Sequence, residues 1–73
     1  MASRRNNVKE IFEQEQYNIR KSSMDYVDCI MSMNGLQKLY NEDDCVQWGV
    51  SDDIYMIEVE FFNGIADEVR LVF

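Results

Sequence analysis

The fold is decided by residues 54–73, which read IYMIEVEFFNGIADEVRLVF. Two runs rich in β-branched and aromatic residues flank Asn63-Gly64. An Asn-Gly pair between such runs is the strongest short-range signal for a β-hairpin. We therefore predict two antiparallel strands, Ile54–Phe62 and Ile65–Phe73.

The alternation of side chains predicts how these strands pair. A two-residue loop would place Ile57 opposite Arg70 and mix apolar with charged side chains on both faces. A loop with an odd number of residues avoids this, and a type I turn followed by Gly64 in the left-handed position of a G1 bulge provides one. The apolar face then holds Tyr55, Ile57, Val59, Phe61, Ile65, Val69, Leu71 and Phe73. The other face holds Met56, Glu58, Glu60, Phe62, Ala66, Glu68, Arg70 and Val72.

The second face of this hairpin gathers Glu58, Glu60 and Glu68 around Arg70. Same-face positions on a strand lie about 6.8 Å apart, so the three carboxylates are predicted to form an anionic patch. Like charges that face each other across a sheet cost a few tenths to about 1 kcal/mol. We interpret the retained repulsion as a sign that this patch is used.

The first half of the chain is predicted to be helical. Asn7 with Glu10 forms a variant of the capping box, which starts a helix over residues 8–21. Ser22 with Asp25 offers a second cap, for a helix over 23–33 that ends at Asn34-Gly35 in a left-handed cap. The alternative is a strand over 26–33, with Asn34-Gly35 as a hairpin turn into residues 36–40.

Between the helices and the hairpin the signals are shorter. Leu36, Leu39 and Tyr40 suit one further helical turn, and residues 41–44 form an acidic connection. Residues 45–50 alternate as a short strand, and residues 51–53 turn the chain.

The elements together predict a single α+β domain over residues 1–73. Its N-terminal helical segment packs on one face of a small antiparallel sheet that ends in the long C-terminal β-hairpin. The alternative architecture has five strands and one helix. Residues 1–6, which carry Arg4 and Arg5, are expected to be a disordered basic arm.

Several function classes lack support in the sequence. The chain has no histidine, no phosphate-binding glycine loop and no nucleophile elbow, so we expect no enzyme, no metal and no cofactor. Cys29 and Cys45 are read as two buried, reduced thiols. No apolar run approaches the roughly 18 residues of a membrane span, and no signal peptide is evident, so we expect a cytoplasmic protein without membrane contact.

Charge gives the positive functional signal. From residue 22 to 73 the chain has eleven carboxylates and two bases, and the whole chain has a net charge of −7. Duplex nucleic acid would be repelled, whereas a basic protein surface would be attracted. The candidate contact residues are Glu42, Asp43, Asp44, Asp52, Asp53, Glu58, Glu60, Glu68 and Phe62.

In size, charge and compactness the chain resembles the small acidic inhibitors encoded by bacteriophages, including those that mimic DNA. The resemblance covers the whole chain but shares no motif, so it carries over no site residues. It implies an inhibitor in the host cytoplasm that occupies the basic DNA-binding surface of a nucleoid, repair or restriction protein. The alternatives are an immunity protein or antitoxin that covers a basic toxin active site, and a structural or regulatory subunit. A homodimer is expected, because the helical segment is long relative to its core.

Overall fold

The computed structural model describes residues 7–73 as two helices followed by a four-stranded antiparallel sheet. The predicted disordered arm, residues 1–6, lies outside the described residues. The helices are α1, Val8–Ile19, and α2, Met24–Met33. The strands are β1, Gln37–Glu42; β2, Cys45–Gly49; β3, Met56–Phe62; and β4, Ile65–Val72. The α+β prediction is confirmed, and the alternative with one helix and five strands is wrong.

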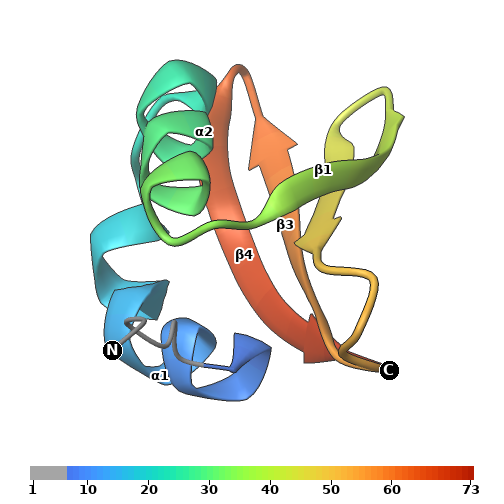
Figure 1. Cartoon of the computed structure of the whole chain (residues 1–73). Helices are drawn as coiled ribbons and strands as arrows, with labels where there is room; N and C mark the ends of the chain where they lie inside the picture. The colour runs from blue at the N-terminus through green and yellow to red at the C-terminus, as the bar shows by residue number, and fades with distance from the viewer. Residues whose placement is uncertain (1–6) are drawn as a thin grey trace.

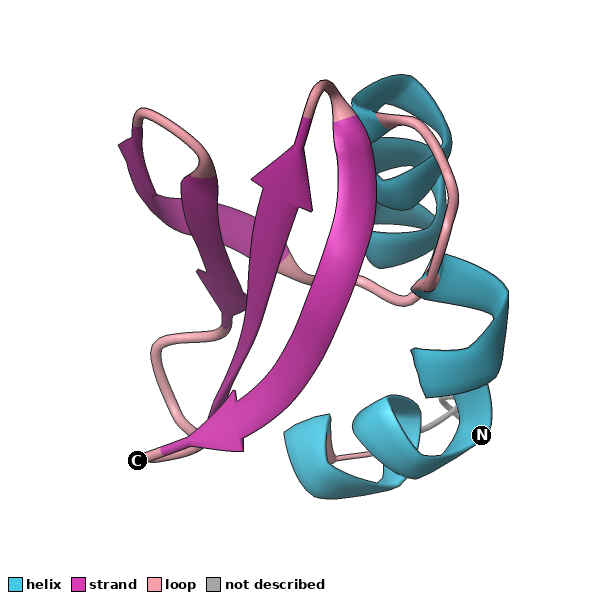
Figure 2. Cartoon of the chain, turned by 180° about the vertical axis from the view of Figure 1, so that it is seen from behind, coloured by secondary structure: helices cyan, strands magenta, loops and turns pink. Residues whose placement is uncertain are grey.

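The strands form a meander in the order β1-β2-β3-β4, which leaves β1 and β4 at the edges. Both helices lie on the same side of the sheet, where α1 contacts β3 and β4 and α2 contacts β4 (Figures 1 and 2). We call the other side of the sheet the open face. Within residues 7–73, no helix is long and apolar enough to cross a membrane.

The core lies between the helices and the sheet. Its buried members are Val8, Ile11, Ile19, Val27, Ile30, Met31, Leu36, Val46, Trp48, Ile57, Val59, Phe61 and Ala66. The Trp48 indole also donates to Asp28 Oδ1 on α2 at 3.4 Å, which satisfies its buried N–H. The core thus joins every helix to the two central strands.

Short-range signals set both helix boundaries. At the start of α1 the capping box is present, because the Asn7 side chain accepts from the Glu10 N–H and Glu10 reaches back to the Asn7 N–H. The N-cap of α2 is Ser23, which corrects the predicted Ser22. Ser22 instead bonds the carbonyl of Asn18 with its hydroxyl.

Helix α2 ends as predicted at Asn34-Gly35, and the strand predicted as an alternative over residues 26–33 is wrong. Gly35 has a φ of 79°. The Leu36 N–H bonds the carbonyl of Met31, and the Gly35 N–H bonds that of Ser32, as in a Schellman motif.

The helical turn predicted at Leu36, Leu39 and Tyr40 is wrong, because this stretch belongs to β1. The two-residue connection Asp43-Asp44 pairs Glu42 with Cys45, and Asp43 takes a φ of 53° that aspartate tolerates better than most residues. An irregularity at Leu39 separates the pairs Lys38–Trp48 and Tyr40–Gln47. The cross-strand bonds to β2 therefore outweigh the local helical spacing.

The turn between β3 and β4 differs from the predicted odd-length loop. Phe62 pairs directly with Ile65, and both Asn63 and Gly64 have positive φ, 54° and 78°, as in a type I′ turn. Farther along, a bulge at Asp67 brings the odd-numbered residues of both strands back to the same face. Phe61 pairs with Ala66, whereas Glu60 pairs with Glu68.

The bulge exchanges the predicted faces of Ile65 and Ala66. Ala66 is fully buried in the core, while Ile65 is 43% exposed on the open face. Beyond the bulge the predicted register holds, with Ile57 opposite Leu71 and Glu58 opposite Arg70.

Candidate protein-interaction face

The strand registers align the polar side chains of the open face in two rows that cross all four strands. We call the first the carboxylate row, which consists of Glu42, Cys45, Glu60 and Glu68. The second, the arginine row, consists of Tyr40, Gln47, Glu58 and Arg70. Neighbouring strands lie about 4.8 Å apart, so the three acids of the carboxylate row span roughly 14 Å.

Arg70 holds the three predicted carboxylates together. Its Nη2 lies 3.0 Å from Glu58 Oε2 and 3.4 Å from Glu60 Oε1, and its Nη1 bonds Glu68. Hydrogen bonding to Glu58 raises the pKa of Arg70 further above its ordinary value. One guanidinium thus relieves part of the repulsion between Glu60 and Glu68, which face each other across the strands.

Glu58 is the most engaged of these acids. In addition to Arg70, it accepts hydrogen bonds from the Cys45 thiol at 3.1 Å and from the Gln47 amide at 3.2 Å. The Cys45 bond, followed by the Arg70 bond, lowers the pKa of Glu58. Its side chain is only 17% exposed, compared with 52% for Glu60 and 54% for Glu68. Glu58 therefore organises the face, and the other two are accessible to a partner.

Cys45 lies in the carboxylate row as a protonated thiol. Burial, then its hydrogen bond to Glu58, raises the pKa of the thiol to about 11. The thiolate is the reactive form of cysteine, so Cys45 acts here as a hydrogen-bond donor rather than as a nucleophile.

The predicted acids of the β1–β2 turn continue the row at its β1 end. Glu42, Asp43 and Asp44 line a shallow depression of ≈ 340 Å³ together with Tyr40, Cys45 and Glu60. The Tyr40 hydroxyl bonds the Glu42 carboxylate, which raises the pKa of Tyr40. We call Glu42, Asp43, Asp44 and Glu60 the acidic corner.

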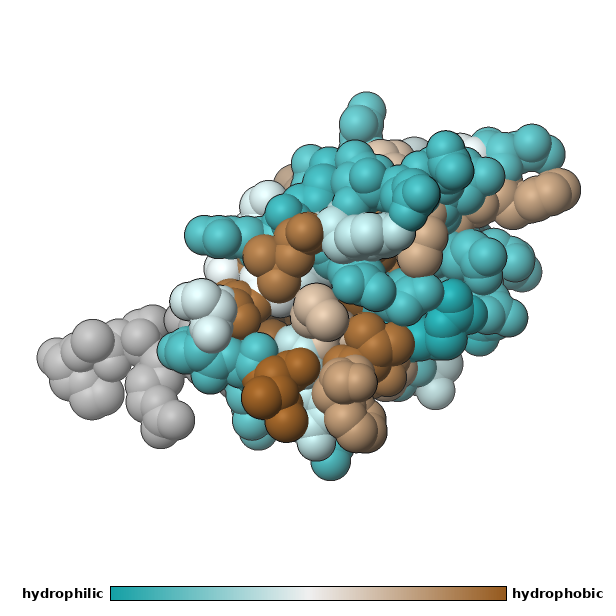
Figure 3. All heavy atoms as spheres, turned by 90° about the vertical axis from the view of Figure 1, so that its right-hand side faces the viewer, coloured by the Kyte–Doolittle hydropathy of each residue, from teal (hydrophilic) through white to brown (hydrophobic). Residues whose placement is uncertain are grey.

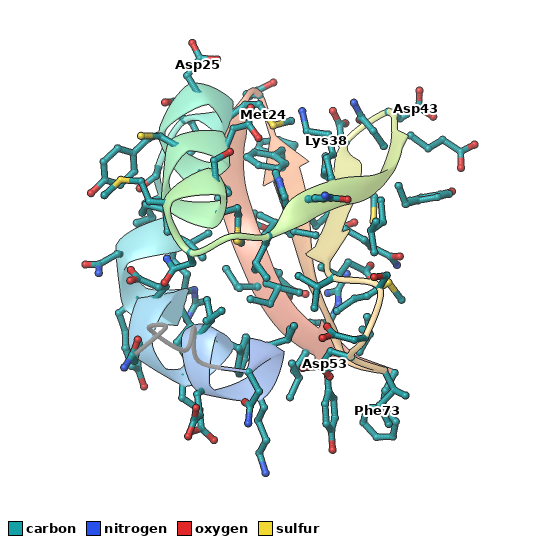
Figure 4. All side chains as sticks on the ribbon, in the orientation of Figure 1. Met24, Asp25, Lys38, Asp43, Asp53 and Phe73 are labelled. Atoms are coloured by element: carbon teal, nitrogen blue, oxygen red, sulfur yellow. The ribbon has the colours of Figure 1, made fainter. Side chains whose placement is uncertain are left out.

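The structure places Asp52 and Asp53 away from this corner. Figure 4 shows Asp43 at the tip of the β1–β2 turn and Asp53 at the opposite end of the sheet, near the start of α1. Asp53 Oδ2 accepts the Val8 N–H at 3.0 Å, and its Oδ1 accepts the Tyr55 N–H at 3.0 Å. Asp52 lines a separate depression with residues such as Gly35 and Gln37. Asp53 thus holds the start of α1 against the strand connection.

Apolar side chains flank the polar rows on both sides. Phe62 and Ile65, a cross-strand pair next to the carboxylate row, are 69% and 43% exposed. At the other end Met56 pairs with Val72, while Ile54 and Phe73 are exposed. Figure 3 shows apolar side chains gathered in the lower part of this side of the molecule, with hydrophilic ones above them. The open face therefore combines a charged centre with apolar borders.

Tyr40 and Cys45 belong to this face, although neither is among the contact residues predicted from the sequence. The local pattern predicts a helical turn at Tyr40 and a buried thiol at Cys45. The structure leaves Cys45 partly buried and Cys29 exposed, so the prediction that both thiols are buried is wrong for Cys29. The signal that could have found Tyr40 and Cys45 is the acidic pair Asp43-Asp44 between two short alternating segments, which is typical of a tight hairpin.

The same arrangement bears on metal binding. Among residues 7–73, no group of three or more His, Cys, Asp or Glu side chains is placed to hold a metal ion. The convergent carboxylates bind Arg70 instead.

Comparison of the chain with protein-family models, curated proteins and solved structures found no match.

Proposed function

We propose that this chain is an acidic protein-binding module whose open face occupies the basic DNA-binding surface of a partner protein. The observation that carries the proposal is the carboxylate row, in which three exposed acids stand in line across four strands beside exposed Phe62 and Ile65. DNA-binding proteins meet lines of phosphates with Lys and Arg. A row of carboxylates offers such side chains a comparable set of acceptors.

The residues of the open face have different roles in the proposed binding. The acidic corner and Glu68 attract and orient a basic partner, because exposed charges act mainly on association rate and specificity. Phe62 supplies an apolar anchor of the kind that contributes most binding energy in protein interfaces. Glu58 and Arg70 keep the row in position.

Paired charge variants test the proposal by affinity capture from a lysate at low salt. The double variant Glu42→Lys/Glu60→Lys reverses two charges of the acidic corner. Glu13→Lys/Glu15→Lys makes the same change in net charge on α1 and is the matched control. We expect wild type and control to capture basic DNA-binding proteins, and the corner variant to bind them at least tenfold more weakly, a change of about 1.4 kcal/mol.

The outcomes separate the alternative functions. Capture of one cognate toxin in place of DNA-binding proteins would favour an immunity protein. Equal capture by the corner variant and its control would show that total charge, and not the carboxylate row, attracts the partner. Bound partners are also expected to dissociate as salt rises, since the contacts are exposed.

A further inference from the structure

Strand β4 is an edge of the sheet and is only partly covered. At its start, Ala66 exchanges two backbone hydrogen bonds with the α1–α2 connection, donating to Ser22 at 2.8 Å and accepting from Lys21 at 2.7 Å. Among residues 7–73, no backbone partner covers the outer edge of β4 beyond this point. Figure 2 shows the remainder of β4 running along the rim of the sheet.

The direction of the free backbone groups follows from the alternation along a strand. The Phe61 N–H bonds Asp44 next to β2, so the odd residues of β3 point their backbone groups toward β2 and the even residues toward β4. The backbone groups of Glu58 and Glu60 therefore bond those of Arg70 and Glu68 on β4. The N–H and carbonyl groups of Val69 and Leu71 point outward from the edge.

The core is also thinner at this edge. Ile57 and Val59 on β3 are fully buried, whereas Val69 and Leu71, their partners on β4, are only partly buried. Val69 and Leu71 thus present both unpaired backbone groups and incompletely covered side chains. An added strand would satisfy both.

The charges on β4 are self-complementary. We propose that a second copy of this chain docks here, with the two β4 strands antiparallel about a twofold axis at Val69. In this register Glu68 lies opposite the partner copy's Arg70, and Arg70 opposite its Glu68. These pairs stand at non-hydrogen-bonded positions, where side chains come closest, and the two Val69 residues exchange backbone bonds. Such a contact uses the same patch on both copies, as a closed dimer requires.

The other edge suits this role less well. Strand β1 is irregular at Leu39, and all of its residues are exposed, with Leu39 at 48% and Tyr40 at 45%. Irregular edges resist strand addition.

Because the twofold axis is perpendicular to the sheet, a β4 dimer would present both open faces on the same side. The dimer does not depend on the proposed function.

A charge reversal at the axis tests the dimer. Sedimentation of the full chain should give twice the 8.7 kDa mass of one copy. Glu68→Arg places two arginines opposite each other at both pairs and should weaken dimerisation at least tenfold. Within one copy the new side chain faces Glu60, so the fold should persist, which circular dichroism checks. Glu13→Arg on α1 is the matched control and should dimerise like wild type.

A cysteine pair tests the register. In a Cys29→Ser background, Val69→Cys places two thiols across the axis with Cα atoms about 5.5 Å apart, within disulfide range. Leu71→Cys puts its thiols on opposite sides of the axis, too far apart to bond. Under mild oxidation we expect a covalent dimer from the first variant only. Wild type that sediments as a monomer, Glu68→Arg that still dimerises fully, or equal crosslinking at both positions would overturn the proposal.

Discussion

Glu58 is the residue on which the polar order of the open face depends. Its pKa is lowered by the Cys45 and Arg70 bonds, so ionised Glu58 is favoured in the folded chain. A lowered pKa contributes stability above the unfolded value, 4.5 for this group, and that stability is lost as pH falls through the folded value. The side chain is mostly buried, so this effect should be measurable.

The corresponding prediction concerns Glu58→Gln. At pH 7 we expect the free energy of unfolding to fall by about 1 to 2 kcal/mol, because a hydrogen bond to a charged group is lost. The gap to wild type should narrow as the pH drops below 4.5. Urea unfolding at pH 7 and pH 3 measures both effects, with Glu13→Gln as the exposed control. A gap that stays constant with pH would contradict the assignment.

Asp53 has a structural task at the start of α1. It accepts the N–H groups of Val8 and Tyr55, each at 3.0 Å. We predict that Asp53→Ala lowers the unfolding free energy by about 1 to 3 kcal/mol, because two donors lose a charged acceptor. Asp44→Ala, at an exposed side chain of the β1–β2 turn, should change it by less than about 0.5 kcal/mol. Thermal or urea unfolding of both variants decides whether Asp53 has this role.

Among the elements, those predicted correctly have strong local causes. The capping box of Asn7 and Glu10 and the left-handed Gly35 act within a few residues, so the sequence pattern marks the ends of both helices. The α1 and α2 limits consequently differ from the predicted ranges by only one or two residues. The alternation from Ile57 to Glu60 likewise predicted which side chains face the core.

The elements predicted wrongly depend on contacts between strands. An odd-length loop and a two-residue loop followed by a bulge both bring the apolar side chains of the two strands onto one face, so the alternation of side chains alone does not distinguish them. The small Ala66 accounts for the choice, since it fits the fully buried site opposite Phe61 while Ile65 stays exposed. Similarly, the local pattern of residues 36–40 suits a helix, but pairing with β2 makes it a strand.

The turn offers a prediction that separates the two loops. Asn63 has a φ of 54° in the type I′ turn, whereas the type I turn first predicted would give it a negative φ. A β-branched side chain is strained at positive φ, so Asn63→Val should cost about 1 to 2 kcal/mol of stability. Asn63→Gly should be nearly neutral. If chemical unfolding shows equal stability for both variants, the two-residue turn is wrong.

At the scale of the whole molecule, composition predicted that the surface is acidic but not where the acid lies. The alternation of side chains along the hairpin correctly predicted that Glu58, Glu60 and Glu68 lie on one face. Glu42 joins this row only because β1 pairs with β2. Asp53 has a structural role because it bonds Val8, which lies 45 positions away in the sequence. Such long-range contacts leave no local trace in the sequence.

The carboxylate row is proposed to occupy the DNA-binding surface of a partner, so the chain and duplex DNA should compete for that partner. Competition tests this directly: the complex of a captured partner with the fluorescently labelled chain is titrated with duplex DNA, and fluorescence anisotropy reports the fraction of the chain that is still bound. We predict mutually exclusive binding, so that DNA displaces the chain completely. The apparent affinity of the chain for its partner should fall in proportion to the DNA concentration. A stable ternary complex of chain, partner and DNA would show that the carboxylate row does not occupy the DNA-binding surface.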